Sequence, residues 1–221
     1  MNNTYNGFLI HTRDYKETSS LISIFTSQHG LKSLLFKGKH TNKERFKFSL
    51  FNEYSFTFNN KYNLPYLSKF ENIKEYRFDK KFYVLGMYIN ELLYKTIKEG
   101  FDFDKVYVHY KDFLINLSNS NDSLNRMALL FEKKLLQDLG YELTLSENTT
   151  LDVNNEYYYD YSSGFKVNVT QNNDVISGKN LHLFFINTLT QENAIKNLRS
   201  VIRNILRQIY PEINLIGDKL F

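Results

Sequence analysis

The sequence predicts an α+β fold: a small five-stranded antiparallel β-barrel, followed by an α-helical bundle domain that carries a small β-hairpin insert. The barrel is predicted by five short runs rich in Ile, Leu, Phe, Tyr and Thr, which follow one another with turn residues between them. No helical segment separates these runs, so they leave no room for crossover connections. The helical part is predicted by a change in apolar spacing at Asp79. We therefore expect a barrel domain at residues 1–78 and a helical domain at residues 79–221.

The first three expected strands are separated by the polar segment 14–18 and by the turn Gln28-His29-Gly30. They are Gly7–Arg13, Ser20–Thr26 and Leu31–Lys37. Side chains alternate along a regular strand, so Phe8 and Arg13 are expected on opposite faces of the first one.

Two more strands complete the expected barrel. Tyr54, Phe56 and Phe58 alternate with polar residues in the run 51–58. The fifth run, Leu64–Tyr76, has Pro65 at its start, where a missing backbone N–H is tolerated. Closure of the five strands into a barrel would remove the exposed strand edges.

From Asp79 onward, apolar residues recur at spacings of three and four, which indicates amphipathic helices. The first helix is expected to end at Gly100, and the second covers 104–117. The third has Asn121 or Asp122 as its cap and stops at Gly140. Short connections predict that these three helices pack together.

The segment at about 147–176 breaks the helical pattern. It is rich in Asn, Asp and Tyr, and it contains the turn Ser162-Ser163-Gly164 followed by an alternating run. We interpret it as a hairpin insert. The helical pattern resumes near Leu181 and is strongest from Thr190, the expected cap, to Tyr210, which precedes Pro211.

Composition restricts the possible classes of protein. The 221-residue chain has no Cys, which excludes disulfides and thiolate metal sites and fits a reducing compartment. Its first residues lack a basic segment followed by an apolar one, and no run approaches the length of a membrane span. We therefore expect a cytoplasmic protein without a membrane partner.

Charge is distributed unevenly along the chain. Residues 1–78 hold twelve Lys and Arg against six Asp and Glu, whereas residues 79–221 hold sixteen against eighteen. A basic, strand-rich head favours an anionic partner there. The alternative is a charge asymmetry without functional consequence.

The motifs of catalysis are missing from the sequence. It has no phosphate-binding Gly-rich loop, no G-x-S-x-G elbow and no thiol nucleophile. Its five His residues are scattered, and no pair has the spacing of metal ligands on a helix. We expect a binding protein, with no catalytic residues, no cofactor and no metal.

Two cationic segments are candidate binding sites. The first is a loop after the third strand in which Phe46 and Phe48 lie among basic residues, a pattern typical of single-strand binding by phosphate contacts and base stacking. Its basic residues are Lys39, His40, Lys43, Arg45 and Lys47. The second segment is a stripe beside the apolar face of the last helix, which suits an acidic peptide or a nucleic-acid backbone. Its residues are Lys196, Arg199, Arg203 and Arg207. The alternative for this stripe is a solvated flank of an ordinary core helix.

Several motifs resemble the bacterial RecO family, in the same order and through nearly the whole chain. The N-terminal signature is GFLIHTRDYKETSSLISIFTSQHGLKSLLFKG, at residues 7–38. The run YINELL at residues 88–93 is similar to the family's first long helix. The segment from Phe131-Glu132 to Leu139-Gly140-Tyr141 is similar to its F-E-x-x-L-L-x-x-L-G-Y helix end. Ser177-Gly178-Lys179 and the terminal Leu220-Phe221 also have counterparts in the family.

The resemblance implies an oligonucleotide/oligosaccharide-binding (OB) fold followed by a helical domain. It implies a non-enzymatic DNA repair and recombination mediator that binds single- and double-stranded DNA and anneals complementary strands. The implied protein partners are RecR, the acidic, Phe-ended tail of single-strand-binding protein, and indirectly RecA, which the family helps to load onto coated single strands in the RecFOR pathway. The residues expected to contact DNA are Arg13, Lys16, Lys32, Lys37, Lys39, His40, Lys43, Arg45 and Lys47.

The chain departs from the family pattern at its C-terminus, where L-K-S-R-E-L-F is weakened to LIGDKLF at residues 215–221, and at two places that bear on the expected sites. Many members carry four Cys as a zinc site in the insert, but residues 147–176 contain none, so no zinc is expected. Many members also carry an Arg just ahead of the F-E motif, where this chain has Leu129-Leu130. We expect Arg126, one turn earlier, to take its place, together with Arg199 and Arg203, in binding the tail of single-strand-binding protein.

Two other functions remain open from the sequence. One is a protein-interaction adaptor with an incidental basic face, and the other is an RNA-binding barrel, which the long helical domain disfavours. DNA binding and the adaptor function differ in salt dependence, because neutralising several phosphates makes affinity fall steeply with salt.

Overall fold

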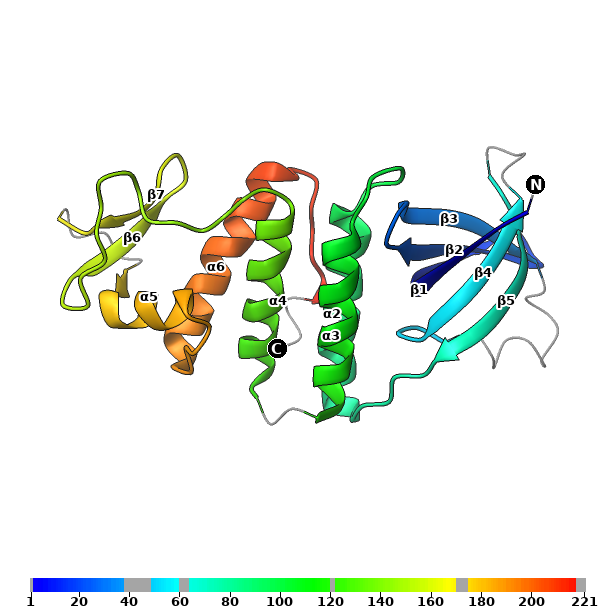
Figure 1. The fold of residues 1–221 in the computed structure, drawn as a ribbon, viewed down its shortest axis with the longest axis horizontal. Coiled ribbons are helices and arrows are strands. Elements are labelled where there is room, and N and C mark those ends of the chain that lie inside the picture. Colours follow the sequence, from blue (N-terminus) through cyan, green and yellow to red (C-terminus); the bar gives the residue numbers. More distant parts are fainter. Residues whose placement is uncertain (1, 38–48, 60–63, 120–121, 170–174, 218–221) are drawn as a thin grey trace. The chain divides into compact units, whose positions relative to one another are not determined.

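The structure of the protein is a computed structural model (Figure 1). It describes residues 2–37, 49–59, 64–119, 122–169 and 175–217. The chain divides into two compact units. The first comprises Met1–Ser120 together with Leu215–Phe221, and the second comprises residues 121–214. The expected domain boundary at residue 78 stays a prediction.

The first unit contains the predicted five-stranded antiparallel sheet, and the α+β class is confirmed (Figure 1). Its strands lie in the order β3-β2-β1-β4-β5. They are β1 (Asn2–Tyr15), β2 (Ser19–Thr26), β3 (Gly30–Lys37), β4 (Glu53–Asn59) and β5 (Leu67–Lys74). The sheet is not closed along its length. Among the described residues, its two edges are joined by one parallel bridge between Leu35 and Tyr66, where the Leu35 N–H donates to the Pro65 carbonyl at 2.9 Å.

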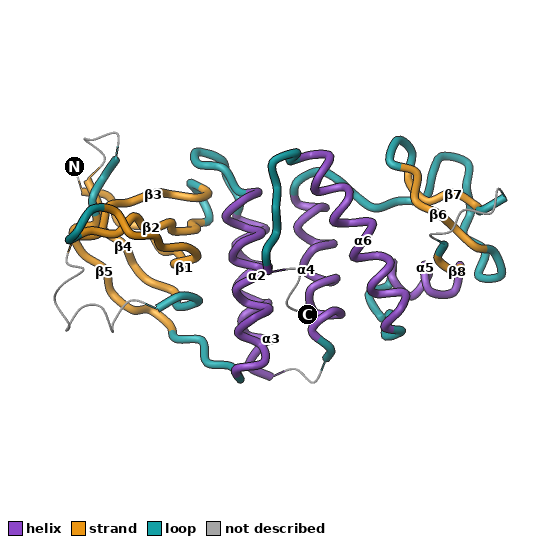
Figure 2. Tube along the Cα trace, turned by 180° about the vertical axis from the view of Figure 1, so that it is seen from behind, coloured by secondary structure: helices purple, strands orange, loops and turns teal. Residues whose placement is uncertain are grey.

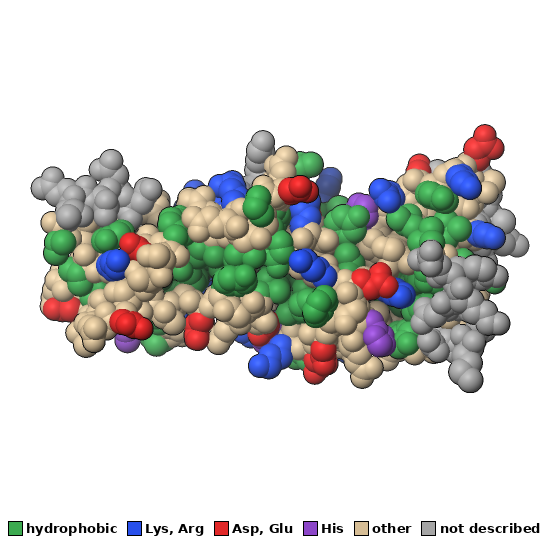
Figure 3. Space-filling view, turned by 90° about the horizontal axis from the view of Figure 1, so that it is seen from above, with side chains coloured by type: hydrophobic (Ala, Val, Ile, Leu, Met, Phe, Trp, Pro, Cys, Tyr) green, Lys and Arg blue, Asp and Glu red, His purple; other side chains and the backbone are tan. Residues whose placement is uncertain are grey.

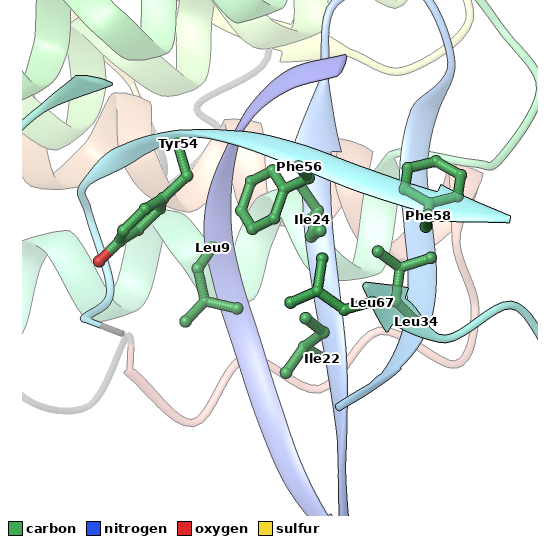
Figure 4. Packing of buried hydrophobic residues seen from close by; sticks show 8 residues of the cluster. All are labelled: Leu9, Ile22, Ile24, Leu34, Tyr54, Phe56, Phe58 and Leu67. Carbon is green, nitrogen blue, oxygen red and sulfur yellow. The ribbon is translucent and has the colours of Figure 1, made fainter. Parts of the chain in front are cut away.

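The inner face of this sheet holds the barrel core (Figure 4). All five strands contribute to it, and every member is at most 9% exposed. The members are Leu9, Ile22, Ile24, Leu34, Tyr54, Phe56, Phe58 and Leu67. The alternation expected for residues 54–58 is confirmed, because Tyr54, Phe56 and Phe58 all lie in this core.

A β-bulge in β1 overturns the strict alternation expected for that strand. Phe8 pairs with Phe25 and Arg13 pairs with Leu21, and the pairing register shifts between Leu9 and His11. Phe25 and Leu21 are four residues apart on β2, so they share a face. Phe8 and Arg13 therefore lie on the same, outer face although they are five residues apart. The expectation that they lie on opposite faces is wrong, because a bulge adds one residue to one strand of a pair.

Two helices cover one end of this outer face, α2 (Lys80–Thr96) and α3 (Asp104–Asn119) (Figure 2). The Phe8 ring lies 5.1 Å from the Tyr107 ring and 5.0 Å from the Tyr110 ring, both of which belong to α3. Asn90 of α2 donates to the Ile10 carbonyl at 3.2 Å and accepts from the Tyr110 hydroxyl at 2.5 Å. Aromatic packing and one satisfied buried amide therefore join the sheet to both helices.

A second contact joins the β2–β3 turn to the loop between α2 and α3. The Gly100 N–H donates to the His29 carbonyl, and the Phe103 N–H donates to the Ser27 carbonyl at 2.8 Å. Gly30 has φ +60°, and a Cβ atom there would lie 2.1 Å from the Lys98 carbonyl oxygen. The turn needs glycine for both reasons, because other residues rarely adopt positive φ and no side chain fits.

The chain returns to the first unit near its C-terminus. The Ile216 and Gly217 N–H groups donate to the two oxygens of the Glu91 carboxylate, at 3.0 and 2.8 Å. Glu91 also forms an ion pair with Lys95 at 3.0 Å. Burial raises the pKa of Glu91, but these hydrogen bonds and Lys95 outweigh it, so its pKa is below its ordinary value.

The second unit is built on two packed helices, α4 (Leu124–Asp138) and α6 (Glu192–Ile209). Between them lie β6 (Glu156–Asp160), β7 (Gly164–Val167), β8 (Ile176–Ser177) and α5 (Gly178–Phe185). The sequence predicts that α2, α3 and α4 pack together, whereas the structure divides them between the two units. The N-caps also differ from expectation. Ser123 caps α4 by accepting from the Arg126 N–H, and Gln191 occupies the cap position of α6.

The predicted hairpin insert is confirmed by the antiparallel pairing of β6 with β7. Its turn is organised by Asp160, whose carboxylate accepts from the Ser162 N–H at 2.9 Å and from Lys166 Nζ at 3.1 Å. The hydroxyls of Ser162 and Ser163 donate to the same carboxylate. These hydrogen bonds hold the pKa of Asp160 well below its ordinary value.

None of the helices in the described part of the chain is long and apolar enough to cross a membrane.

The Glu91 contact predicts a local, pH-dependent stabilisation of residues 216 and 217. In Glu91→Gln, the amide oxygen replaces only one of two charged acceptors, so we expect the Ile216 and Gly217 amides to exchange hydrogen roughly fivefold faster, which corresponds to about 1 kcal/mol. The pKa of Glu91 is lower in the folded state than in the unfolded state. The stabilisation by Glu91 is therefore fully present above the ordinary pKa of Glu and is lost as the pH falls through the folded-state pKa.

The matched control is Glu71→Gln on β5, whose carboxylate is paired with Lys69 at 2.5 Å. It should leave the exchange of both amides unchanged. Equal exchange rates in Glu91→Gln and the wild type near neutral pH would contradict the prediction.

Candidate nucleic-acid interface

The helices leave the other end of the outer face uncovered, and two cross-strand rows meet there. In the first row Arg13 pairs with Leu21, which pairs with Leu35, which bridges to Tyr66. In the second row Tyr15 pairs with Ser19, which pairs with Lys37. Directly paired residues place their side chains on the same face of a sheet. We call six of these residues the outer-face patch: Arg13, Tyr15, Leu21, Leu35, Lys37 and Tyr66.

The patch combines exposed rings with cations. Tyr15 is 37% exposed and Tyr66 is 39% exposed. The Lys16 ammonium lies 5.5 Å from the centroid of the Tyr15 ring, and the Lys37 ammonium lies 5.4 Å from that of Tyr66. Such contacts are attractive because the ring face is electron-rich. Each tyrosine therefore presents a ring face next to a positive charge.

Leu21 and Leu35 lie at the centre of the patch. Both side chains are only partly buried, so the centre presents an apolar surface. Tyr15 and Lys37 are two strands apart, a distance of about 10 Å. Figure 3 shows one face of the molecule, on which cationic, hydrophobic and acidic side chains are all visible over the strand-rich part. A flexible single strand of a few nucleotides matches this spacing and chemistry, with its bases on the rings and its phosphates near the cations.

His11 marks the boundary between the covered and the open parts of the outer face. Its ring stacks on Tyr94 of α2, with centroids 4.3 Å apart and planes inclined by 24°. Burial lowers the pKa of His11, and the charge of nearby Arg13 lowers it further. His11 is therefore neutral near pH 7, and the charge of the patch comes from Arg13, Lys37 and the adjacent Lys16.

The acidic residues next to the patch lie at its margin. Asp14 pairs with Ser20, so it points to the face opposite Arg13 and Tyr15. Glu17 lies in the exposed turn between β1 and β2. The six residues of the outer-face patch thus include two cations and no acidic side chain.

The structure brings together three of the residues predicted to bind DNA, namely Arg13, Lys16 and Lys37. Lys32 lies elsewhere. It pairs with Ile24 near the other end of β3, and its ammonium forms an ion pair with Glu99 at 2.6 Å. The remaining five lie outside the described residues: Lys39, His40, Lys43, Arg45 and Lys47.

Sequence reasoning missed Tyr15 and Tyr66. Strict alternation along β1 places Arg13 and Tyr15 on the face opposite Phe8. Tyr66 joins the patch through the bridge to Leu35 and the contact with Lys37, both between residues far apart in sequence. The one local signal for a binding role of Tyr15 was that it directly precedes Lys16, where the turn begins.

Arg199, predicted to bind a peptide tail, is buried in the second unit and 2% exposed. Its guanidinium donates to both oxygens of Glu132, with NH2 to Oε1 at 2.9 Å, and its NH1 donates to Asn125 Oδ1 at 2.6 Å. Glu132 is 0% exposed. In this conformation, Arg199 joins α6 to α4.

Arg126 also contacts groups of its own chain. Its side chain donates to the Leu189 carbonyl at 2.9 Å and to the Asn187 carbonyl at 3.0 Å, and it pairs with Asp122. It therefore holds the α5–α6 loop against the start of α4. Arg203 is half-buried on α6. The role of these three arginines in binding a protein tail stays a prediction.

In the described part of the chain, no three His, Cys, Asp or Glu side chains lie close enough together to hold a metal ion. The expectation of no zinc and no cofactor stays a prediction.

Two family models match consecutive parts of the chain. The model described as recombination protein O N terminal matches residues 1–76, and recombination protein O C terminal matches residues 77–210. The chain belongs to the RecO family. It is therefore a member of a family of DNA repair proteins, and the resemblance inferred from its motifs is confirmed.

Curated relatives named DNA repair protein RecO match over nearly their whole length. The one from Psychromonas ingrahamii is 28% identical and aligns over 97% of this chain and 93% of the relative. Those from Coxiella burnetii and Actinobacillus pleuropneumoniae are each 27% identical, over 91% and 99% of this chain and 90% and 94% of the relatives.

The Arg199–Glu132 pair predicts an asymmetric response to mutation. Arg199→Ala leaves a buried carboxylate without its cation, so we expect a loss of about 3–5 kcal/mol in the free energy of unfolding, measured by urea denaturation. The double variant Arg199→Met/Glu132→Leu removes both charges and should recover most of that loss. A single variant as stable as the wild type would contradict this account of the pair.

Proposed function

We propose that this chain is a non-enzymatic recombination mediator that binds single- and double-stranded DNA and anneals complementary strands. In this proposal it also helps to load RecA onto single strands coated by single-strand-binding protein, in the RecFOR pathway. Its direct protein partners would be RecR and the acidic tail of single-strand-binding protein. We place it in the bacterial cytoplasm, associated with the nucleoid, and we expect it to need no metal or cofactor.

The outer-face patch is the observation that carries this proposal. Neutralising phosphates supplies most of the affinity for DNA, and Arg13, Lys16 and Lys37 place three cations at one end of the barrel. The exposed rings of Tyr15 and Tyr66 add sequence-tolerant stacking, which only unpaired bases offer. Annealing needs a surface that holds unpaired bases and screens the charge of the backbone, and it needs no catalytic group.

Membership of the RecO family supports the DNA repair context, because the family models are described as recombination protein O and the relatives are named DNA repair protein RecO. The basic residues at 39–47 follow directly after Lys37 in the sequence. They would extend the cationic surface beyond the patch. A protein-interaction adaptor remains the competing function, and salt dependence separates the two.

Removing the cations of the patch should weaken binding to every DNA. For Arg13→Ala/Lys37→Ala, we expect the log–log slope of single-strand affinity against salt to shrink by about 1.4, because each lost phosphate contact contributes about 0.7. Fluorescence anisotropy with a labelled oligonucleotide at several salt concentrations measures this slope.

The control for charge is Lys80→Ala/Lys105→Ala, two exposed lysines on α2 and α3 of the same unit. It should keep the wild-type slope. If the wild type shows neither DNA binding nor faster annealing of oligonucleotides coated with single-strand-binding protein, the mediator function is wrong and the adaptor function is favoured.

Removing the rings should act on single strands alone. Tyr15→Ala/Tyr66→Ala should weaken single-strand binding by about 1–3 kcal/mol per lost stacked base, with little change in duplex binding or in the salt slope. Tyr15→Phe/Tyr66→Phe retains both ring faces and should bind as the wild type does. Equal losses on single strands and duplexes would show that the rings do not stack on bases.

A further inference from the structure

The outward face of α6 in the second unit has an unusual composition. Its sequence between Asn193 and Gln208 contains no Asp or Glu. The exposed and half-buried polar side chains on this stretch are all hydrogen-bond donors or cations. They are Asn193, Lys196, Asn197, Ser200, Arg203, Asn204, Arg207 and Gln208.

The cations of this face form a narrow line. At 100° per residue, Lys196, Arg203 and Arg207 lie within about 40° of one another around the helix axis. Lys196 and Arg207 are eleven residues apart, which corresponds to about 16 Å along the axis. Arg199 departs from this line and is buried against Glu132. The line therefore consists of three of the four cations in the predicted stripe, of which Lys196 and Arg207 are exposed and Arg203 is half-buried.

The neighbouring insert adds an aromatic residue to this surface. The Asn204 side chain donates to the Tyr161 hydroxyl at 3.1 Å and accepts from Arg207 NH1 at 2.9 Å. Tyr161 is 45% exposed. The acidic groups near the two ends of this surface are engaged, because Asp160 pairs with Lys166 and Glu192 accepts from Asn125.

We propose that this α6 face is a second binding surface for a nucleic-acid backbone, separate from the outer-face patch. Single-strand phosphates repeat at intervals of a few ångströms, so a line of about 16 Å meets several of them. Neutral Asn, Ser and Gln donors suit phosphate oxygens as well as the cations do. An acidic peptide with an apolar end fits less well, because the exposed side chains of α6 between Asn193 and Gln208 are cations and small polar groups. The exposed ring beside them, Tyr161, is hydrogen-bonded to Asn204 through its hydroxyl.

The inference rests on the proposed DNA-binding function and deepens it. With one surface on each compact unit, a single chain holds two strands at once. Annealing then proceeds on the protein, because both strands are bound to one molecule and their encounter becomes intramolecular. The α6 face is the capture surface for the second strand.

The test uses the full chain and two double variants of equal charge. Lys196→Ala/Arg207→Ala changes the α6 face, where both side chains are exposed. Lys134→Ala/Lys179→Ala removes two exposed lysines from α4 and α5 of the same unit. Circular dichroism and thermal unfolding should show that both variants fold as the wild type does.

Two readouts are measured for each protein. The first is the binding of a fluorescein-labelled oligodeoxythymidine to the protein that carries one equivalent of an unlabelled oligonucleotide that cannot pair with it. The second is the annealing rate of two complementary oligonucleotides. We expect the α6 variant to bind the first strand within about twofold of the wild type, to lose the ternary complex and to anneal several-fold more slowly. The Lys134/Lys179 variant should match the wild type.

If the α6 variant forms the ternary complex and anneals like the Lys134/Lys179 variant, this inference is overturned, while wild-type DNA binding leaves the proposed function standing. A loss confined to binding of an acidic peptide would overturn it in favour of a protein partner. A wild type that binds no DNA at all would overturn both the inference and the proposed function.

Discussion

The aromatic packing between the outer face of β1–β2 and helices α2–α3 is the contact on which the first unit depends. Phe8 and Phe25 are fully buried there against Tyr107 and Tyr110, on the side of the sheet opposite the barrel core. β1 and β2 thus carry apolar side chains on both faces where α2 and α3 cover them. Exposed polar side chains appear on the outer face only beyond the helices. Because the two helices cover just this end, they determine which part of the outer face can meet a partner.

The bulge in β1 connects this packing to the candidate interface. It lies between Leu9 and His11, where the buried part of the strand gives way to the open part. A bulge re-aims the side chains that follow it, so Arg13 and Tyr15 face outward with Lys37 and Tyr66. One additional residue in one strand therefore decides whether the first unit presents these side chains together or on two faces.

The second unit uses its charged residues in two different ways. Arg199 and Glu132 are fully buried and hydrogen-bonded to each other, so they contribute to the specific pairing of α4 with α6. Lys196 and Arg207, on the same helix, are exposed. Four cations that look equivalent in a helical stripe thus have distinct environments, because α4 covers only one side of α6.

The sequence by itself determined the class of fold, the five strands, the hairpin insert and the family, because these follow from local apolar spacing, turn residues and ordered motifs. It also indicated the basic head. Only the tertiary structure decided that Arg13 shares a face with Phe8, that Tyr66 lies beside Leu35, and that Arg199 is buried. Each of these depends on a register shift or on a contact between residues distant in the chain. Such contacts are set by the packing of whole elements, which local patterns do not encode.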